Sequence, residues 1–281
     1  MTVRDALRVA PGTAVNLESI DPGGTPAFPH RRKGGKSWAR QELVGLGARL
    51  ETMQEQLFAT AKVAQNRRRV LLVLQAMDCG GKDGTIRKVA GTMNPQGLTI
   101  VSFGPPTKEE LAHDFLWRIR KALPVPGQIG VFNRSHYEDV LVVRVHDLVP
   151  KRTWRARYAK INDFERSLVD DGVTMIKIML HISYAEQGER LRQRLADPTK
   201  YWKYNPADVD ERAHWDDYQA AYADALSRCS TEGAPWYIVP ANLKWYRDWA
   251  VANILAETLG DLGLHYPPPT FDLEVERARL G

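Results

Sequence analysis

The chain has 281 residues, of which 43% are hydrophobic and 26% charged, and it fits one sizeable α/β domain of an ordinary globular protein. It contains no apolar stretch of the roughly 18 residues that span a bilayer. Its only cysteines are Cys79 and Cys229, so we expect a cytoplasmic protein without membrane contact or a disulfide framework. The net charge of +5 favours anionic partners, but no basic arm or RNA-binding aromatic signature is present, so nucleic acid is not expected.

The N-terminal residues 1–38 are rich in Pro, Gly and Arg and lack sustained periodicity. This pattern is typical of an extended arm that wraps the surface or is partly disordered. We expect the main domain at 39–270 and a C-terminal tail at 271–281. Beyond Gln41, apolar residues recur in steps of three and four, which predicts one face of a helix: Leu43, Leu46, Leu50, Met53 and Leu57. This face is expected to pack on the domain's own sheet, with a subunit contact as the alternative.

Five short apolar runs follow, and helical stretches alternate with them. The runs are suited to strands buried on both faces: Val70–Gln75, Leu98–Phe103, Ile129–Asn133, Thr174–Ile182 and Trp236–Pro240. Helices are expected at about 84–93, 107–122, 137–146, 152–170, 184–196, 207–229 and 243–262. The alternation predicts a parallel five-stranded sheet flanked by helices on both faces. Polar residues that follow the strands should meet at one edge of this sheet: Asp78, Asn133, Arg134 and Asn242.

The turn after the first strand carries the clearest chemical signal. An apolar strand joins a helix through Gly80, Gly81 and Lys82, the context in which backbone N–H groups and one ammonium bind phosphate. The usual pattern is Gly-x4-Gly-Lys-Ser/Thr. Here Ala76 replaces the first glycine and Asp83 replaces the hydroxyl residue. A loop that lacks these nucleotide-fitting details is expected to hold a different polyphosphate.

Carboxylates near such a loop need a cationic partner. Asp78 would be repelled by bound phosphate, so it is expected to bind Mg²⁺ or accept a substrate proton, with a helix-capping turn as the alternative. After the third strand, Asn133 occupies the position that usually holds a metal-serving acid, and Glu138 follows five residues later. Arg134 suits bidentate phosphate recognition. His136 is expected to position or pack.

A basic helix end, broken by a proline and followed by lysines among aromatics, covers residues 190–206. We interpret it as part of a mobile lid at about 184–215 that carries cations onto phosphates and closes the site to water. A solvated charged face explains its arginines nearly as well.

Taken together, the loop and the segments NRSHYE, DPxKxWK, APWYIVP and KWYRDWAV resemble the polyphosphate kinase type-2 family over about Gly35 to Pro269. The resemblance implies a P-loop kinase-like α/β fold, similar to thymidylate kinase, with a helical lid. It implies reversible transfer of the terminal phosphate of inorganic polyphosphate to AMP or ADP, with Mg²⁺ (Mn²⁺ as the alternative) and without a phosphorylated protein. It further implies adenine or guanine nucleotides as partners and a homodimer or homotetramer.

The resemblance also implies roles for individual residues. Asp78, Lys82 and Arg134 would be catalytic, and Asp78 with Glu138 would serve the metal. Family members that act mainly on diphosphates commonly read Asp-Arg-Ser-x-Tyr-Asn, whereas this chain reads Asn-Arg-Ser-His-Tyr-Glu, which resembles the branch that acts on mono- and diphosphates. The expected substrate-binding residues are Gly80, Gly81, Asp83, Gly84, Thr85, Arg87, Lys88, Asn133, Arg190, Arg194, Lys200 and Lys203.

Two other functions stay open at this point. The first is an ATP-dependent nucleoside or nucleotide kinase of the thymidylate kinase type, against which Ala76 and Asp83 argue. The second is a polyanion-binding protein without turnover. It leaves the pair Asp78 and Glu138 unexplained, because carboxylates weaken pure anion binding.

Overall fold

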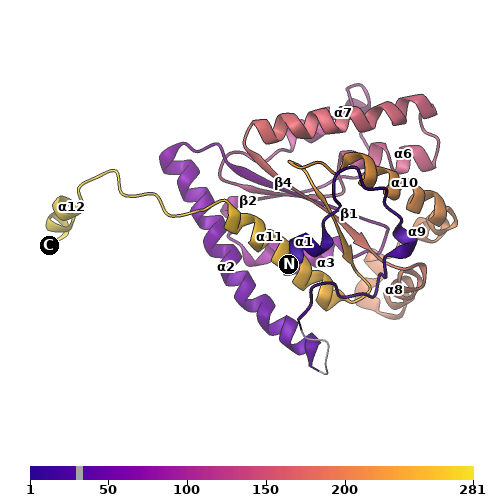
Figure 1. Cartoon of the computed structure of the whole chain (residues 1–281), viewed down its shortest axis with the longest axis horizontal. Helices are drawn as coiled ribbons and strands as arrows, with labels where there is room; N and C mark the ends of the chain where they lie inside the picture. The colour runs from indigo at the N-terminus through magenta and orange to yellow at the C-terminus, as the bar shows by residue number, and fades with distance from the viewer. Residues whose placement is uncertain (30–33) are drawn as a thin grey trace.

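The computed structural model describes residues 1–29 and 34–281. Its centre is a five-stranded, all-parallel sheet in the order β2-β3-β1-β4-β5 (Figure 1). The strands are β1 Arg69–Ala76, β2 Leu98–Ser102, β3 Ile129–Asn133, β4 Val173–His181 and β5 Trp236–Pro240. The predicted parallel sheet flanked by helices is therefore confirmed, with strand ends that differ from the prediction by no more than one residue.

The α-helices of the described residues are α1 Val3–Leu7, α2 Gly35–Ala64, α3 Lys82–Lys88, α4 Lys108–Leu111, α5 Trp117–Lys121, α6 Val142–Val145, α7 Lys151–Asp170, α8 Tyr184–Ala196, α9 Ala207–Asp210, α10 Trp215–Cys229, α11 Lys244–Asp261 and α12 Leu273–Leu280. The single helix expected at 107–122 is wrong, because the chain breaks into α4 and α5. Asp114 Oδ1 accepts a hydrogen bond from the Leu116 N–H at 3.0 Å, and this local turn competes with a continuous helix. The stretch expected at 137–146 begins as a 3₁₀ turn, η4 (His136–Asp139), before α6.

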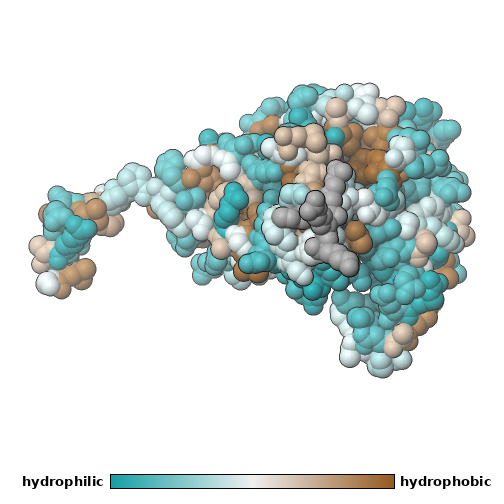
Figure 2. Space-filling model, turned by 60° about the horizontal axis from the view of Figure 1, so that its bottom comes forward, coloured by the Kyte–Doolittle hydropathy of each residue, from teal (hydrophilic) through white to brown (hydrophobic). Residues whose placement is uncertain are grey.

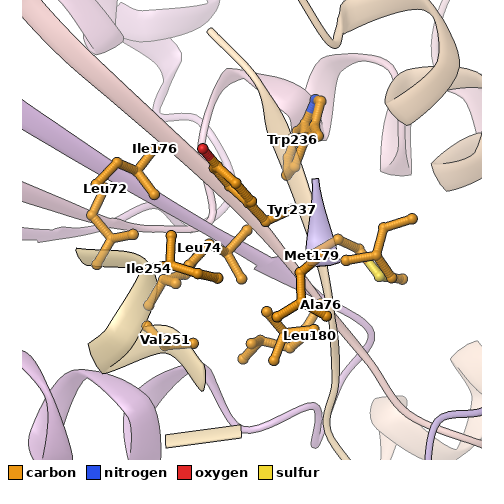
Figure 3. Close-up of a cluster of buried hydrophobic side chains, with 14 of the residues drawn as sticks. Leu72, Leu74, Ala76, Ile176, Met179, Leu180, Trp236, Tyr237, Val251 and Ile254 are labelled. Atoms are coloured by element: carbon orange, nitrogen blue, oxygen red, sulfur yellow. The ribbon is translucent and has the colours of Figure 1, made fainter. Parts of the chain in front are cut away.

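Side chains of β1 alternate between the two faces of the sheet, as the two-residue period of a strand requires. Leu71 and Val73 belong to a core cluster that includes Phe164 of α7. Leu72 and Leu74 point to the other face, where Figure 3 shows them beside Val251 and Ile254 of α11. Full burial of a leucine side chain contributes about 1.5–3 kcal/mol. The strand is therefore fixed from both sides, and it carries the site at its carboxyl end.

The apolar face predicted over 43–57 lies on α2, where Leu46, Leu50 and Leu57 are buried. The face packs within its own domain, as expected. Its main partner is α11 rather than the sheet itself, and the two helices run side by side (Figure 1). The sheet is covered on this side by α11, so α2 forms an outer layer.

The N-terminal residues 1–29 lie along β5 at the edge of the sheet. The Val9 N–H donates to the Trp236 carbonyl at 2.8 Å, and Arg8 forms an antiparallel bridge with Tyr237. Further along, the Pro22 carbonyl accepts a hydrogen bond from the Asn242 N–H at 3.0 Å. The arm thus covers an edge strand that would otherwise expose unpaired backbone groups. Residues 30–33 of the predicted arm lie outside the described residues.

Within the described ranges, no helix combines the length and the apolar character that crossing a membrane requires. On the face shown in Figure 2, hydrophilic residues predominate, with separate hydrophobic patches on the body. The C-terminal extension with α12 stands clear of the rest of the molecule in both views.

Candidate active site

The turn between β1 and α3, which we call the glycine loop (Met77–Gly81), depends on glycine at two positions. A Cβ atom on Gly80 would lie 2.4 Å from the Cβ of Ala76. Gly81 has a φ of +108°, and a Cβ there would lie 1.9 Å from Nη1 of Arg247. Any side chain at these positions would therefore clash, and the glycines let a ligand approach the backbone closely.

Lys82 is the first residue of α3 and is only 9% exposed. Its Nζ donates to the Ala76 carbonyl at 3.0 Å, so the residue in place of the missing first glycine helps to fix the ammonium. Burial lowers the pKa of Lys82, although the Asp78 and Glu138 carboxylates act in the opposite sense. The site thus holds a desolvated cation whose charge an arriving anion would stabilise.

Arg134 joins the end of β3 to the glycine loop. Its Nη2 donates to Oδ1 of Asp78 at 3.0 Å. The residue has a φ of +64°, a left-handed conformation that costs a non-glycine residue about 1–2 kcal/mol. Burial acts to lower the pKa of the guanidinium, but Glu138 and Asp78 outweigh it and raise the pKa. A strained arginine held between two carboxylates is typical of a functional site.

Two amide–carboxylate pairs flank this centre. Asn133 Nδ2 donates to Oδ1 of Asp83 at 2.8 Å. The amide found in place of the usual acid after β3 thus pairs with the acid found in place of the usual hydroxyl residue. In the second pair, Gln75 Nε2 donates to Oε1 of Glu138 at 3.0 Å. Asn133 and Asp83, which both depart from the common sequence pattern, are therefore hydrogen-bonded to each other.

A buried network of side-chain hydrogen bonds around Glu165 holds η4 in place. His136 is fully buried, with Nε2 3.2 Å from Oε1 of Glu165. The Tyr137 hydroxyl donates to the same oxygen at 2.8 Å, and Lys177 Nζ donates to the other carboxylate oxygen at 2.5 Å. His136 therefore packs and positions, as predicted, and the network fixes the turn that presents Glu138.

Arg190 connects three parts of the site. This 6% exposed side chain donates to the carbonyls of Cys79 and Gly80 at 2.8 and 3.1 Å. It also donates to the carbonyls of Ala241 and Asn242 in the turn after β5. These contacts hold α8, the glycine loop and the β5 turn together.

The lid predicted at about 184–215 consists of α8, a 3₁₀ turn at Pro198–Lys203, α9 and a second 3₁₀ turn at Glu211–His214. Arg194 Nη1 donates to the Lys203 carbonyl at 2.7 Å and lies 3.2 Å from Oδ2 of Asp208. Lys203 Nζ lies 4.8 Å from the ring centre of Trp202. The cations of this segment are therefore partly paired within the segment itself.

A groove of about 1960 Å³ joins these elements. The four polar residues expected to meet at the sheet edge all line it. The groove is also lined by the following residues predicted to bind substrate: Gly80, Gly81, Asp83, Gly84, Arg87, Lys88, Asn133, Arg190, Arg194, Lys200 and Lys203. Lys82 lines it as well. Thr85 is instead fully buried, and Glu138 lies beside Gln75 behind the groove.

The sequence did not single out four further cations of the groove. Lys36 and Arg40 come from the first turns of α2, and Lys244 and Arg247 come from the start of α11. Arg247 is 4% exposed and lies against both Gly81 and Gly84. Its guanidinium donates to Asp248, with Nε 2.9 Å and Nη2 2.6 Å from Oδ1. The position of α11 directly after β5 could have revealed Lys244 and Arg247, because that strand end faces the groove.

Comparison with known proteins matches this architecture to one family. The model of the Polyphosphate kinase 2 (PPK2) family matches residues 37–263. The chain belongs to this family. The AMP/ADP-polyphosphate phosphotransferase of Meiothermus ruber is 50% identical to this PPK2 chain over 262 residues, which cover 93% of this chain and 95% of that protein.

Two other relatives support the same assignment. The ADP-polyphosphate phosphotransferase of Rhodopseudomonas palustris is 45% identical, with 79% of each chain covered. The crystal structure of Polyphosphate Kinase 2 from Arthrobacter aurescens TC1 superposes with a TM-score of 0.95 at 46% identity, covering 100% of this chain and 96% of that chain. The resemblance noted in the sequence and the P-loop kinase-like fold are thereby confirmed.

Proposed function

We propose that this PPK2 protein transfers the terminal phosphate of inorganic polyphosphate to AMP and ADP, giving ADP and ATP, in a reversible, Mg²⁺-dependent reaction. The observation that carries the proposal is the basic groove that continues from the glycine loop between α2, α3 and α11. A nucleoside triphosphate would engage the loop with three phosphates, whereas this row of cations suits a longer anion. The names of the Meiothermus and Rhodopseudomonas relatives favour the same substrates over the two alternative functions.

The polyphosphate donor would lie on the β5 side of the groove. The sheet order places the ends of β2 and β3 on one side of the glycine loop and the end of β5 on the other. Lys244 and Arg247 follow β5, and Lys36 and Arg40 extend the same side. A chain that starts at Lys82 would therefore find successive cations in this direction. Without a ligand these cationic side chains repel one another, and the negatively charged phosphate chain would attract each of them and offset this repulsion.

The nucleotide acceptor would lie on the β2–β3 side. Phe103 and Gly104 follow β2 and line the groove together with Asn133 and Arg134. A guanidinium on this side of the groove suits a nucleotide whose phosphate contacts Arg134. A phosphate oxygen is already ionised at neutral pH, so it can attack the terminal phosphorus without a strong base. Positioning and cationic side chains would supply most of the acceleration.

A divalent cation fits the carboxylates of the site only together with substrate. Among residues 1–29 and 34–281, no group of three or more His, Cys, Asp or Glu side chains could hold a metal ion by itself. Mg²⁺ commonly uses one or two carboxylates and takes its other ligands from water and phosphate oxygens. Asp78 lines the groove and meets this requirement. Glu138 lies behind the groove and acts electrostatically on Lys82 and Arg134, so its role as a metal ligand stays a prediction. When bound, such an ion would neutralise charge on the transferring phosphate.

Mn²⁺ as a substitute cation, guanine nucleotides as acceptors and assembly into a homodimer or homotetramer stay predictions. The leucine face of α2 offers no support for the assembly, since it is covered by α11 of the same chain.

The decisive experiment measures ATP formation from ADP, and separately ADP and ATP formation from AMP, with polyphosphate and Mg²⁺ and without added ATP. We expect product from both acceptors, none with EDTA, and a severe loss in Lys82→Ala. Lys160→Ala serves as the matched control, because Lys160 is 61% exposed on α7 and does not line the groove. Product only when ATP is the donor would indicate a nucleotide kinase. Polyphosphate binding without product would indicate a binding protein.

A further inference from the structure

Arg194, in the last turn of α8, is held by the lid through one of its three guanidinium nitrogens. Its Nη1 donates to the Lys203 carbonyl at 2.7 Å and to Oδ2 of Asp208 at 3.2 Å. Its other nitrogens, Nε and Nη2, donate no hydrogen bond to any of residues 1–29 and 34–281. The side chain lines the groove. One end of the guanidinium is therefore fixed inside the lid, and the other end is left for an anion.

Asp208 lies on α9, in the part of the lid that faces the glycine loop. Its side chain is 16% exposed and lines the groove. Asp78 in the glycine loop and Arg134 after β3 both act electrostatically on it. Arg194 and Asp208 in turn both act on Cys79, the residue after Asp78. The ion pair between Arg194 and Asp208 therefore lies beside the glycine loop, although both of its members belong to the lid.

A carboxylate is unfavourable at this place unless it has a task. Asp208 is repelled by the carboxylate of Asp78, and it would also be repelled by phosphate bound in the groove. The hydrogen bond from Arg194 offsets part of this cost. An arginine that is already oriented loses less side-chain freedom when phosphate binds, so the same contact favours binding.

We propose that Asp208 is a positioning residue for Arg194: it orients the guanidinium so that Nε and Nη2 donate together to a phosphate in the groove. This inference rests on the proposed function, since the phosphate belongs to the polyphosphate donor. A single acceptor, the Lys203 carbonyl, would leave the planar group free to rotate about one hydrogen bond. Two acceptors on Nη1 define its plane, and a phosphate then accepts the paired bonds in the geometry that guanidinium groups favour.

The test is a double-mutant cycle on kcat/KM for polyphosphate with saturating ADP. Asp208→Ala should lower kcat/KM by about 10–100-fold, the loss expected of a misplaced group. Arg194→Ala should lower it at least as much, and Arg194→Ala/Asp208→Ala should equal Arg194→Ala within about twofold. Asp208→Asn keeps an acceptor oxygen, so it should lose less than Asp208→Ala. Asp210→Ala, at an exposed position on the same helix, is the matched control.

A second readout does not require turnover. Isothermal titration with a short linear polyphosphate should show about tenfold weaker binding to Asp208→Ala than to the wild type. The same change made in Arg194→Ala should weaken binding no further. If Asp208 served only the folding of the lid, its loss would weaken binding by the same factor in both backgrounds.

Tighter polyphosphate binding in Asp208→Ala would show that the carboxylate acts on the substrate by repulsion, and would overturn the inference. Equal losses in the two backgrounds would overturn it as well. A loss that disappears at high Mg²⁺ concentration would make Asp208 a metal ligand instead of a positioning residue. Failure of the proposed function is distinguishable, since the wild type would then form no product from polyphosphate, whereas the binding cycle needs no product.

Discussion

Replacement of Arg190 tests how the glycine loop is held in place. The guanidinium donates to four backbone carbonyls, two in the glycine loop and two in the β5 turn. Its Nε also lies 2.8 Å from Oε1 of Glu186. The side chain is 6% exposed, so water replaces few of these contacts when the arginine is lost.

The magnitude follows from the number of acceptors left without a donor. A hydrogen bond to a charged group contributes about 1.5–3 kcal/mol. Four such bonds, reduced because the vacated space admits some water, give an expected loss of about 4–6 kcal/mol of unfolding free energy for Arg190→Ala. That loss approaches the whole stability of many proteins, about 5–15 kcal/mol. Arg190→Lys keeps the charge and up to three donors, so we expect it to lose about 2–3 kcal/mol.

The assay is equilibrium unfolding in urea of the wild type, Arg190→Lys and the control Arg192→Lys, followed by kcat and KM for polyphosphate. Arg192 lies on the same helix and is 71% exposed, so its replacement should change the unfolding free energy by less than about 0.5 kcal/mol. Arg190→Lys could instead be as stable as the wild type but bind polyphosphate tenfold more weakly. That result would refute the idea that Arg190 holds the glycine loop to the β5 turn. Arg190 would then contact the substrate directly, as the sequence suggested.

Four further changes have defined outcomes. Lys82→Ala should lower kcat by about 10²–10⁴ while the circular dichroism spectrum stays native; a variant that keeps a tenth of the wild-type rate would contradict the role of Lys82. Gly81→Ala places a Cβ 1.9 Å from Nη1 of Arg247 at a φ of +108°, so urea unfolding should show a loss of about 1–3 kcal/mol together with loss of turnover. Arg247→Ala should raise KM for polyphosphate about tenfold, equivalent to about 1.4 kcal/mol, and leave KM for ADP unchanged; Arg166→Ala, at a 68% exposed position, is its control. Burial raises the pKa of Asp139 to about 6 despite its ion pair with Arg157. Because the folded protein then favours the protonated acid, the wild type should lose about 3 kcal/mol of unfolding free energy relative to Asp139→Asn as pH rises from about 3 to 7, and parallel stability curves would rule this out.

The sheet was predictable from the sequence because four of its five strands are buried almost throughout. The edge strand β2 was also expected to be buried on both faces, but its residues are partly buried or exposed. Continuous apolar runs such as Val70–Gln75 cannot serve as half-exposed strands, and alternation with helices leaves a parallel arrangement as the consistent solution. The break between α4 and α5 was not predictable in this way. It depends on one side-chain hydrogen bond of Asp114, which the helical periodicity of its neighbours conceals.

The site was predictable where its residues share one loop or one strand end. The sequence Gly80-Gly81-Lys82 between a strand and a helix identifies the anion-binding turn. Because the carboxyl ends of parallel strands meet at one edge of the sheet, Arg134 is expected beside it. Contacts between distant segments were beyond this reasoning. Gln75 and Glu138 are 63 positions apart, and only the register of β1 beside β3 brings them together.

The binding partner of Arg190 could not be predicted from the sequence either. Its type and its place on a basic helix suggested a phosphate ligand, and the sequence contains nothing that distinguishes a substrate anion from a backbone carbonyl as its partner. The structure shows four carbonyl acceptors around it. Contact of Arg190 with phosphate in the closed lid stays a prediction, which the Arg190→Lys variant tests.

The central claim is that the glycine loop holds an inorganic phosphate chain as the donor. The most direct test is a crystal structure of Asp78→Asn, expected to turn over too slowly to consume its ligands, soaked with polyphosphate and ADP. The account predicts a phosphate chain that starts at Lys82 and follows Arg247 toward α2, with ADP on the side of Arg134. A nucleoside triphosphate seated in the loop, with the phosphate chain bound elsewhere, would contradict it.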